Sequence, residues 1–282
     1  MRIRNIWPVE SSEYLLDRAA LGLRFLPGFC NICGNPTIFL INNRNFREHV
    51  TCRHCQSCNR HRQIASVLLS YLVGSGNQVP LLASLKDIPK STIIWNAENT
   101  RSLHHCLAKQ LGTNYISSEF LDPSLPSGKT VEGVLHVDMQ STHFADNSID
   151  FILSSDVIEH VPEPLVALAE SYRILKTGGC HIFTAPFYHH RFTNEKRAVV
   201  NAAGDVEFLR RPWYHDDPVR AEGTLVYTVF APQLLCDLEA LGFEARLCIL
   251  HSLFHGILGS NGIVIVAKKV KEPNHARDWI FS

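Results

Sequence analysis

Five of the nine cysteines lie between positions 30 and 58, at a spacing that suits a metal ion. Cys30 and Cys33 form one C-x2-C pair, and after eighteen residues Cys52 and Cys55 form another. A tight turn at each pair aims two thiolates at one ion, so two pairs supply the four sulfur ligands of a structural zinc site. Gly34, directly after the first pair, fits such a turn. The sequence therefore predicts a structural Zn2+ held by these four cysteines.

Other ligand sets remain open. Cys55 and Cys58 repeat the same spacing, and His54 and His61 are further possible ligands, so the sequence does not decide whether Cys58 or a histidine binds the ion. The alternatives to zinc are unligated thiols or a redox dithiol, but two pairs in one short segment favour a metal. We expect the ion to stabilise a segment too short to have much core of its own.

The composition excludes several classes of protein. The chain has 282 residues, of which 45% are hydrophobic and 19% charged, enough for a sizeable folded core. Its 27 basic and 27 acidic residues cancel, which argues against a broad basic surface for nucleic acid. No apolar run is long enough for a membrane span, and the N-terminus has no signal-peptide core. We expect a cytoplasmic protein without disulfides, of undetermined oligomeric state.

Three regions divide the chain. Residues 1–75 contain the cysteine cluster, with nine arginines against four acidic residues, and we interpret them as an N-terminal zinc-binding module that ends near the loop Gly74–Asn77. Residues 88–270 alternate short apolar strands with helical patterns, which predicts an α/β fold with a parallel sheet. Residues 271–282 form a polar tail.

The periodicity of the α/β region predicts its elements in order. We expect strands at residues 91–96, 113–118, 131–137, 149–154, 180–185, 243–250 and 263–268, and helices at residues 101–111, 164–175 and 231–240. No clear helix separates the last two strands, so we expect them to form an antiparallel pair at one edge of the sheet.

Residues 134–187 carry a series of motifs in a fixed order. Asp138 follows one strand, Phe144-Ala-Asp-Asn-Ser-Ile-Asp150 opens the next, Ser155-Asp-Val-Ile-Glu-His-Val161 follows it, and Tyr172-Arg-Ile-Leu-Lys-Thr-Gly-Gly179 leads to another. Each motif alone is weak, but together they resemble class I S-adenosylmethionine-dependent methyltransferases with a methyltransferase type 11-like domain. The resemblance implies a Rossmann-like, seven-stranded methyltransferase sheet, with S-adenosyl-L-methionine as cofactor at the carboxyl ends of its strands.

The resemblance also implies a set of cofactor-binding residues. Glu119 matches the acid that binds both ribose hydroxyls, and Asp138, with the Met139 backbone beside it, matches the residue that accepts from the adenine amino group. The first motif, Ile94-Trp-Asn-Ala-Glu-Asn-Thr100, departs from the family because it contains no glycine. Glu98 in this segment would meet the amino end of the cofactor. The implied cofactor site consists of Asn96, Ala97, Glu98, Glu119, Asp138, Met139 and Ser155.

Within this family, the chain resembles a subgroup whose first motif reads roughly Ala-Pro-Glu, which Ala97-Glu98 fits. The subgroup also resembles the chain in its cysteines. It carries an N-terminal cysteine pair and a second pair followed by Arg-x-Arg, as in Arg60-His-Arg62 here. Two interpretations of the module's arginines stay open. They form a solvated face with contacts to the catalytic domain, or they recognise an anionic substrate: Arg44, Arg47, Arg53, Arg60 and Arg62.

More than forty residues separate the strand at 180–185 from the helix at 231–240, and we interpret residues 187–228 as a lid or substrate-binding insertion. Its polar and aromatic residues, with the histidine after the strand at 149–154, are candidates for the catalytic base. The candidates are His160, His189, His215 and Tyr214. An orienting role for Glu159-His160 stays open, as does a divalent metal site at His215-Asp216-Asp217 that would orient a diol.

Taken together, these features predict a S-adenosylmethionine-dependent methyltransferase that methylates an oxygen of a small-molecule or sugar-containing acceptor, without a membrane partner. One alternative is an RNA methyltransferase that holds its RNA with the zinc module. A second is a non-catalytic scaffold protein, since the first motif lacks glycine.

Overall fold

The computed structural model describes residues 2–5, 22–42, 45–73, 82–84, 88–188, 190–215, 222–259 and 262–270. The expected linker at Gly74–Asn77 and the tail at 271–282 lie outside these residues. Among the described helices, none is both long and apolar enough to cross a bilayer.

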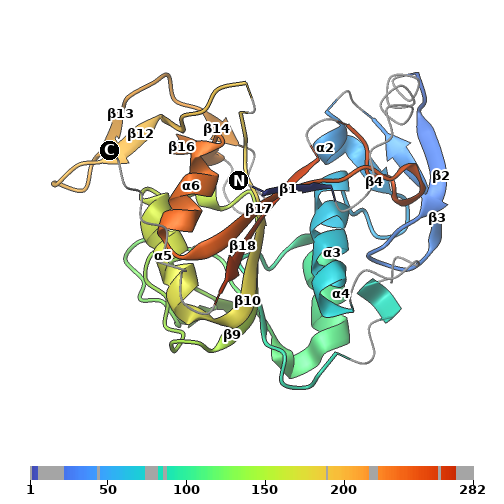
Figure 1. Ribbon diagram of the computed structural model, residues 1–282, viewed down its shortest axis with the longest axis horizontal. Helices are drawn as coiled ribbons and strands as arrows, with labels where there is room; N and C mark the ends of the chain where they lie inside the picture. The colour runs from blue at the N-terminus through green and yellow to red at the C-terminus, as the bar shows by residue number, and fades with distance from the viewer. Residues whose placement is uncertain are drawn as a thin grey trace, which may run out of the picture.

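A seven-stranded sheet runs through the centre of the molecule in the order β1-β17-β18-β10-β9-β5-β6 (Figure 1). The neighbours β6, β5, β9 and β10 are parallel, β18 is antiparallel to both β10 and β17, and β1 is parallel to β17. The strands are β1 (Arg2–Asn5), β5 (Ile94–Asn96), β6 (Tyr115–Ser117), β9 (Ile149–Ser155), β10 (Leu175–Thr184), β17 (Phe243–Ile249) and β18 (Ile263–Lys269). The predicted Rossmann-like sheet is confirmed.

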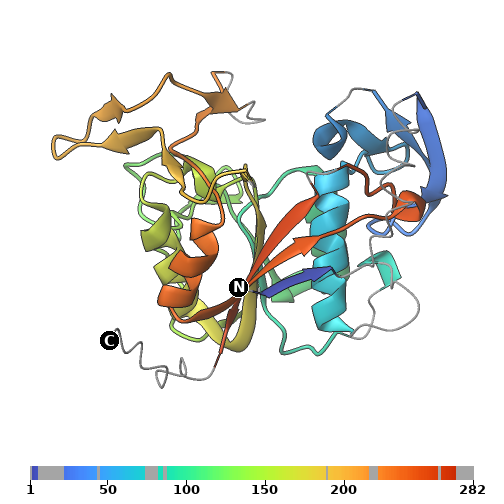
Figure 2. The same ribbon diagram turned by 45° about the horizontal axis from the view of Figure 1, so that its top comes forward.

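Helices cover both faces of this sheet. Figures 1 and 2 show α3 and α4 on one face and α5 and α6 on the other. The four are α3 (Asn59–Leu72), α4 (Arg101–Leu111), α5 (Pro164–Ile174) and α6 (Gln233–Ala240), and 3-10 turns lie at Leu82–Ser84, Gly112–Asn114, Ile158–His160 and Leu253–His255. The predicted bounds of α4 are those observed, because Gly112 takes a positive φ of 56° and ends the helix.

Two strand predictions were wrong. Residues 131–137 do not form one strand, because Glu132 and Gly133 both take positive φ and make a tight turn between β7 (Thr130–Val131) and β8 (Val134–Leu135). Among the described residues, a bridge between Glu119 and His136 joins the segment to the edge of the sheet. The pair β17–β18 is antiparallel as predicted, but β1 lies outside β17 and occupies the edge. Its pairing with residues 246–249 has no local sequence signal.

Apart from β1, which belongs to the central sheet, the described part of the N-terminal module is a three-stranded antiparallel sheet and a short helix, followed by α3. These elements are β2 (Phe25–Phe29), β3 (Pro36–Ile41), α2 (Phe46–His49) and β4 (Val50–Cys52). One apolar core spans both sides of the expected boundary near residue 75. It joins Cys30, Phe39 and Leu68 of the module to Ile94 and Val264 of the central sheet. The module thus packs as part of the same folded body.

The insertion after β10 consists of short antiparallel pairs: β11 with β16, β12 with β13 and β14 with β15. The strands are β11 (Glu195–Lys196), β12 (Ala198–Val200), β13 (Val206–Phe208), β14 (Tyr214–His215), β15 (Thr224–Leu225) and β16 (Thr228–Val229). In both ribbon views the insertion, in orange, and the module, in blue, lie at the upper end of the molecule on opposite sides of the central sheet.

Candidate active site

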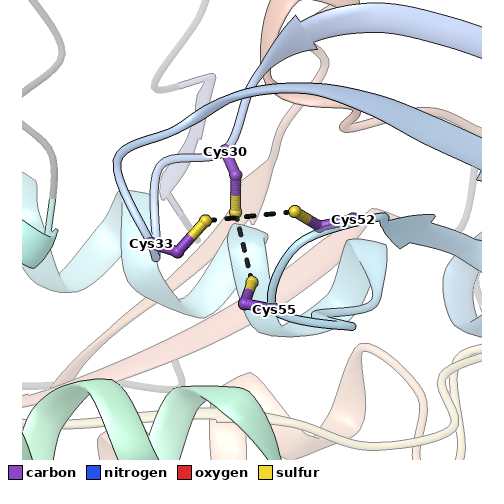
Figure 3. Close-up of side chains that lie close together, drawn as sticks. All are labelled: Cys30, Cys33, Cys52 and Cys55. Carbon is purple, nitrogen blue, oxygen red and sulfur yellow. Dashed lines mark hydrogen bonds between the residues drawn. The ribbon is translucent and has the colours of Figure 1, made fainter.

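The four predicted zinc ligands converge on one point (Figure 3). The sulfurs of Cys30 and Cys55 are 3.7 Å apart, those of Cys33 and Cys52 are 4.0 Å apart, and all four lie within 4.8 Å of one another. Sulfur ligands on a tetrahedral zinc with bonds of about 2.3 Å lie about 3.8 Å apart. The cluster therefore has the donor type and the size that such an ion requires.

Two similar turns build this cluster. The Gly34 amide donates to the Cys30 carbonyl, and the Gln56 amide donates to the Cys52 carbonyl, each over 2.9 Å. Gly34 and Gln56 both take positive φ, 72° and 59°, directly after the second cysteine of each pair. Cys58 lies outside the cluster, at the N-cap of α3, and is 4% exposed.

The first motif follows β5 at the carboxyl edge of the sheet. Asn96 is fully buried and donates through Nδ2 to the Tyr115 hydroxyl over 2.9 Å, while its Oδ1 has no hydrogen-bond partner among the described residues. Ala97 is 7% exposed and bonds the Leu153 carbonyl of β9 through its amide. The backbone of this glycine-free segment is therefore fixed between its two neighbouring strands.

Glu98 is a buried carboxylate with an unsatisfied oxygen. It is 9% exposed, and its Oε2 has no hydrogen-bond partner in the described residues. Its Oε1 lies 3.7 Å from His61 Nε2 of α3 and 4.0 Å from Arg101 Nε. Burial raises the pKa of Glu98, and burial lowers the pKa of His61 to about 4. A cationic group at Oε2 would satisfy this carboxylate.

Glu119 and Asp138 lie at neighbouring positions on the same edge. Glu119 Oε1 accepts from the Asn99 amide over 3.0 Å, which joins the ends of β5 and β6. The Val137 amide donates to the Glu119 carbonyl, so the chain reaches Asp138 beside it. Asp138 Oδ1 accepts from the Gln140 amide over 2.8 Å, and Met139 is 5% exposed. The predicted cofactor residues thus gather at the ends of adjacent strands.

Ser155 ends β9 on this edge, and the N-terminal module contacts it there. Arg60 donates to Ser155 Oγ, and Arg47 forms a two-pronged ion pair with Asp156, whose Oδ1 also accepts from Thr184 Oγ1 over 2.8 Å. Burial opposes the charged form of Asp156, but Arg47 and Arg60 hold its pKa well below its usual value. These ion pairs fix the module beside the expected cofactor site.

Arg62 is buried, and no carboxylate among the described residues pairs with it. It donates to the backbone carbonyls of Val50, His255 and Gly256 over 2.7–2.9 Å, and its guanidinium stacks 4.4 Å from the centre of the Phe39 ring. Arg47, Arg60 and Arg62 are therefore engaged in internal contacts, and Arg44 lies outside the described residues. Of the five arginines in question, Arg53 is exposed.

A second cluster lies just beyond β9. Glu159 is fully buried, and its Oε1 lies 3.6 Å from His160 Nε2 and 3.5 Å from His215 Nδ1. The two imidazole rings are 5.0 Å apart, edge to face. His160 comes from the turn after β9, and His215 comes from β14 of the insertion. The Leu225 carbonyl of β15, the partner strand of β14, accepts from His160 Nδ1 over 2.8 Å. The insertion thus brings His215 to the sheet edge.

Of the remaining candidate bases, Tyr214 is not brought into this cluster. Tyr214 precedes His215 on β14, where successive side chains point to opposite faces, and it is 49% exposed. His189, Asp216 and Asp217 lie outside the described residues.

Sequence reasoning missed two contacts that shape the site. The pairing of Arg47 with Asp156 joins segments more than a hundred residues apart, and no local pattern marks it. Glu159 stood next to His160 in the sequence, but its approach to His215 depends on how the insertion folds.

Comparisons with known proteins bear on the same region. Residues 99–183 match the family model of a methyltransferase domain, and the match begins at the end of the glycine-free segment. This match confirms the resemblance to S-adenosylmethionine-dependent methyltransferases that the sequence predicts. No curated protein sequence matches the chain.

Solved structures with a similar arrangement were also found. A S-adenosylmethionine-dependent methyltransferase from Mesorhizobium loti is 14% identical, covering 64% of this chain and 91% of its own, with a TM-score of 0.36. DesVI from Streptomyces venezuelae is 12% identical, covering 75% and 92%, with a TM-score of 0.43. The 1,6-didemethyltoxoflavin-N1-methyltransferase from Burkholderia thailandensis, with bound S-adenosylhomocysteine, is 14% identical, covering 75% and 79%, with a TM-score of 0.41. These similarities assign no acceptor.

Proposed function

We propose that this class I S-adenosylmethionine-dependent methyltransferase methylates a hydroxyl oxygen of a small-molecule or sugar-containing acceptor. The observation that carries the proposal is the position of the Glu159–His160–His215 cluster directly after β9, on the sheet edge where Glu98 and Glu119 stand. A hydroxyl is a poor nucleophile until it loses its proton, and a cluster of two imidazoles and a carboxylate promotes that loss either as a base or by holding a cation.

The residues at this edge fit the cofactor. The unpartnered Oε2 of Glu98 would accept from the cofactor's ammonium group, which supplies the missing partner of a buried carboxylate. Glu119 would accept from the ribose hydroxyls, and Asp138, with the Met139 backbone, would bind the adenine. When bound, the cofactor supplies a methyl group on a sulfonium sulfur, and the protein's task is to align the acceptor oxygen with it.

Three arginines of the N-terminal module are engaged inside the protein, which supports a small acceptor over RNA. Arg47 and Arg60 are paired with Asp156 and Glu48, and Arg62 is fully buried. Groups that neutralise phosphates must reach solvent, and these three are committed inside the protein. A small acceptor bound between the insertion and the sheet edge needs none of them.

We also propose that the four-cysteine cluster binds one structural Zn2+. Four thiolates complete a tetrahedral shell and leave no open position for chemistry. Thiolates that hold zinc must stay reduced, so this proposal goes with a cytoplasmic location.

The test is calorimetric titration of the zinc-replete protein with S-adenosylhomocysteine. We expect binding that Glu119→Ala weakens at least about tenfold, because a charged hydrogen-bond acceptor is lost. Glu207→Ala, at an exposed position on β13, is the matched control and should bind like the wild type. A folded wild-type protein that binds none would favour the scaffold function instead.

Acceptor chemistry needs a second assay. Methyl transfer from labelled cofactor should be found in a panel of hydroxylated small molecules and sugar conjugates, as base-stable methyl ethers. Label that accumulates in total RNA at the expense of this panel would contradict the proposed acceptor class.

A further inference from the structure

The geometry points to a second metal site: we propose that Glu159, His160 and His215 bind a divalent cation. Their ligand atoms lie within 4.8 Å of one another, and they come from the turn after β9 and from β14 of the insertion. The site is separate from the four-cysteine cluster, in which every ligand is a sulfur.

Glu159 is the first reason. The side chain has no exposed surface, and neither carboxylate oxygen has a hydrogen-bond partner among the described residues. A buried carboxylate without hydrogen bonds is costly, and buried charges in proteins are paired or coordinate metals. The imidazole nitrogens of His215 and His160 lie at 3.5 and 3.6 Å from Glu159 Oε1, too far for good hydrogen bonds. A cation between the three groups would supply the missing partner.

The tautomer of His160 is the second reason. Its Nδ1 lies 2.8 Å from the Leu225 carbonyl oxygen. A carbonyl oxygen only accepts, so Nδ1 carries the proton, and in the neutral ring Nε2 directs a lone pair toward Glu159. Two lone-pair donors that face each other repel unless a cation lies between them. Metal-binding histidines commonly donate their other ring N–H to a backbone carbonyl in this way.

The distances are the third reason. Ligand atoms on one tetrahedral ion with bonds of about 2.1 Å lie about 3.4 Å apart, and Glu159 Oε1 lies 3.6 Å from His160 Nε2 and 3.5 Å from His215 Nδ1. Two imidazoles and one carboxylate suit divalent transition metals such as Mn2+, Fe2+ or Zn2+. Three protein ligands leave positions open for other molecules, as in catalytic rather than structural sites.

The open positions specify the acceptor further, and this step rests on the proposed function. Two neighbouring oxygens of a vicinal diol or enediol would fill them, and the ion lowers the pKa of a hydroxyl bound to it. The hydroxyl proton leaves to solvent and the oxygen forms a bond to the methyl carbon. The carbon–sulfur bond breaks with its electron pair moving to sulfur, which yields a methyl ether, a thioether and one proton.

The experiment titrates Mn2+ into protein dialysed against a weak chelator until one zinc per chain remains, and follows the loss of the free Mn2+ signal by electron paramagnetic resonance. We expect one Mn2+ per chain in the wild type. Glu159→Gln and His215→Ala should each weaken Mn2+ binding at least tenfold. His105→Ala, at an exposed position on α4, should bind Mn2+ like the wild type.

S-adenosylhomocysteine binding, measured on the same samples, separates this proposal from the proposed function. Wild-type protein that binds S-adenosylhomocysteine but no Mn2+, or Glu159→Gln and His215→Ala proteins that bind Mn2+ as the wild type does, would overturn the metal site alone. Protein that binds Mn2+ at this site but no S-adenosylhomocysteine would support the metal site and overturn the methyltransferase proposal.

Discussion

His181 shows what burial does to a single titratable residue. It lies in the middle of β10 without exposed surface, and its Nε2 is 2.8 Å from Ser154 Oγ of β9. Burial lowers the pKa of His181 to about 3, because the charged form would lose its hydration. The native protein therefore holds this ring neutral at a pH where an unfolded chain would already protonate it.

The sign of the resulting pH dependence follows from linkage. Between the unfolded pKa of about 6.5 and the folded value, the unfolded chain binds the extra proton, so the free energy of unfolding falls as the pH drops. At pH 4.5 the loss from His181 reaches about 2.7 kcal/mol. Between pH 7 and pH 4.5, the free energy of unfolding of His181→Gln should therefore fall by about this much less than that of the wild type, as measured by urea unfolding. Equal losses would show that His181 titrates normally.

Among the elements, the contact between the N-terminal module and β9 depends on one carboxylate. Asp156 is 15% exposed and pairs with both prongs of Arg47, while Arg60 approaches it at 3.5 Å. Removing one partner of a buried ion pair leaves the other charge uncompensated, at a cost of about 3–5 kcal/mol. Asp156→Asn should therefore destabilise the protein by about 3 kcal/mol in urea unfolding.

Asp146→Asn is the matched control for this contact. Asp146 also pairs with an arginine, Arg173, but its side chain is 69% exposed, so the loss should stay under about 1 kcal/mol. If the two variants were equally stable, the module would not depend on Asp156 for its attachment to the sheet.

The elements also show where sequence reasoning succeeds. Strands and helices with strong local periodicity, such as α4 and β9, were predicted within a few residues, and the ends of neighbouring parallel strands brought Glu98 and Glu119 to one edge as expected. The failures have non-local causes. β1 depends on pairing with β17, and the Glu159–His215 contact depends on the course of a long insertion.

For the whole molecule, the shared apolar core means that the four-cysteine cluster and the methyltransferase sheet should unfold together. Cys30 and Cys52 are fully buried in the same core as Ile94, Leu153 and Val266 of the central sheet. Two structural units that share a core have no separate stability to lose. The cysteine cluster thus acts on the stability of the cofactor-binding edge, although its proposed ion takes no part in the chemistry.

Loss of the proposed zinc tests this coupling. Extraction with a strong chelator removes the proposed ion, and Cys33→Ser removes one of its ligands. Since the binding free energy of a structural ion is also folding free energy, a loss on the order of 5 kcal/mol should lower Tm by on the order of 10 °C. Scanning calorimetry should show one transition that moves as a whole, with S-adenosylhomocysteine binding lost at the same temperature. A new transition at low temperature, with the main one unmoved, would mean that the module unfolds by itself and that the core contacts of Cys30 and Cys52 do not couple it to the sheet.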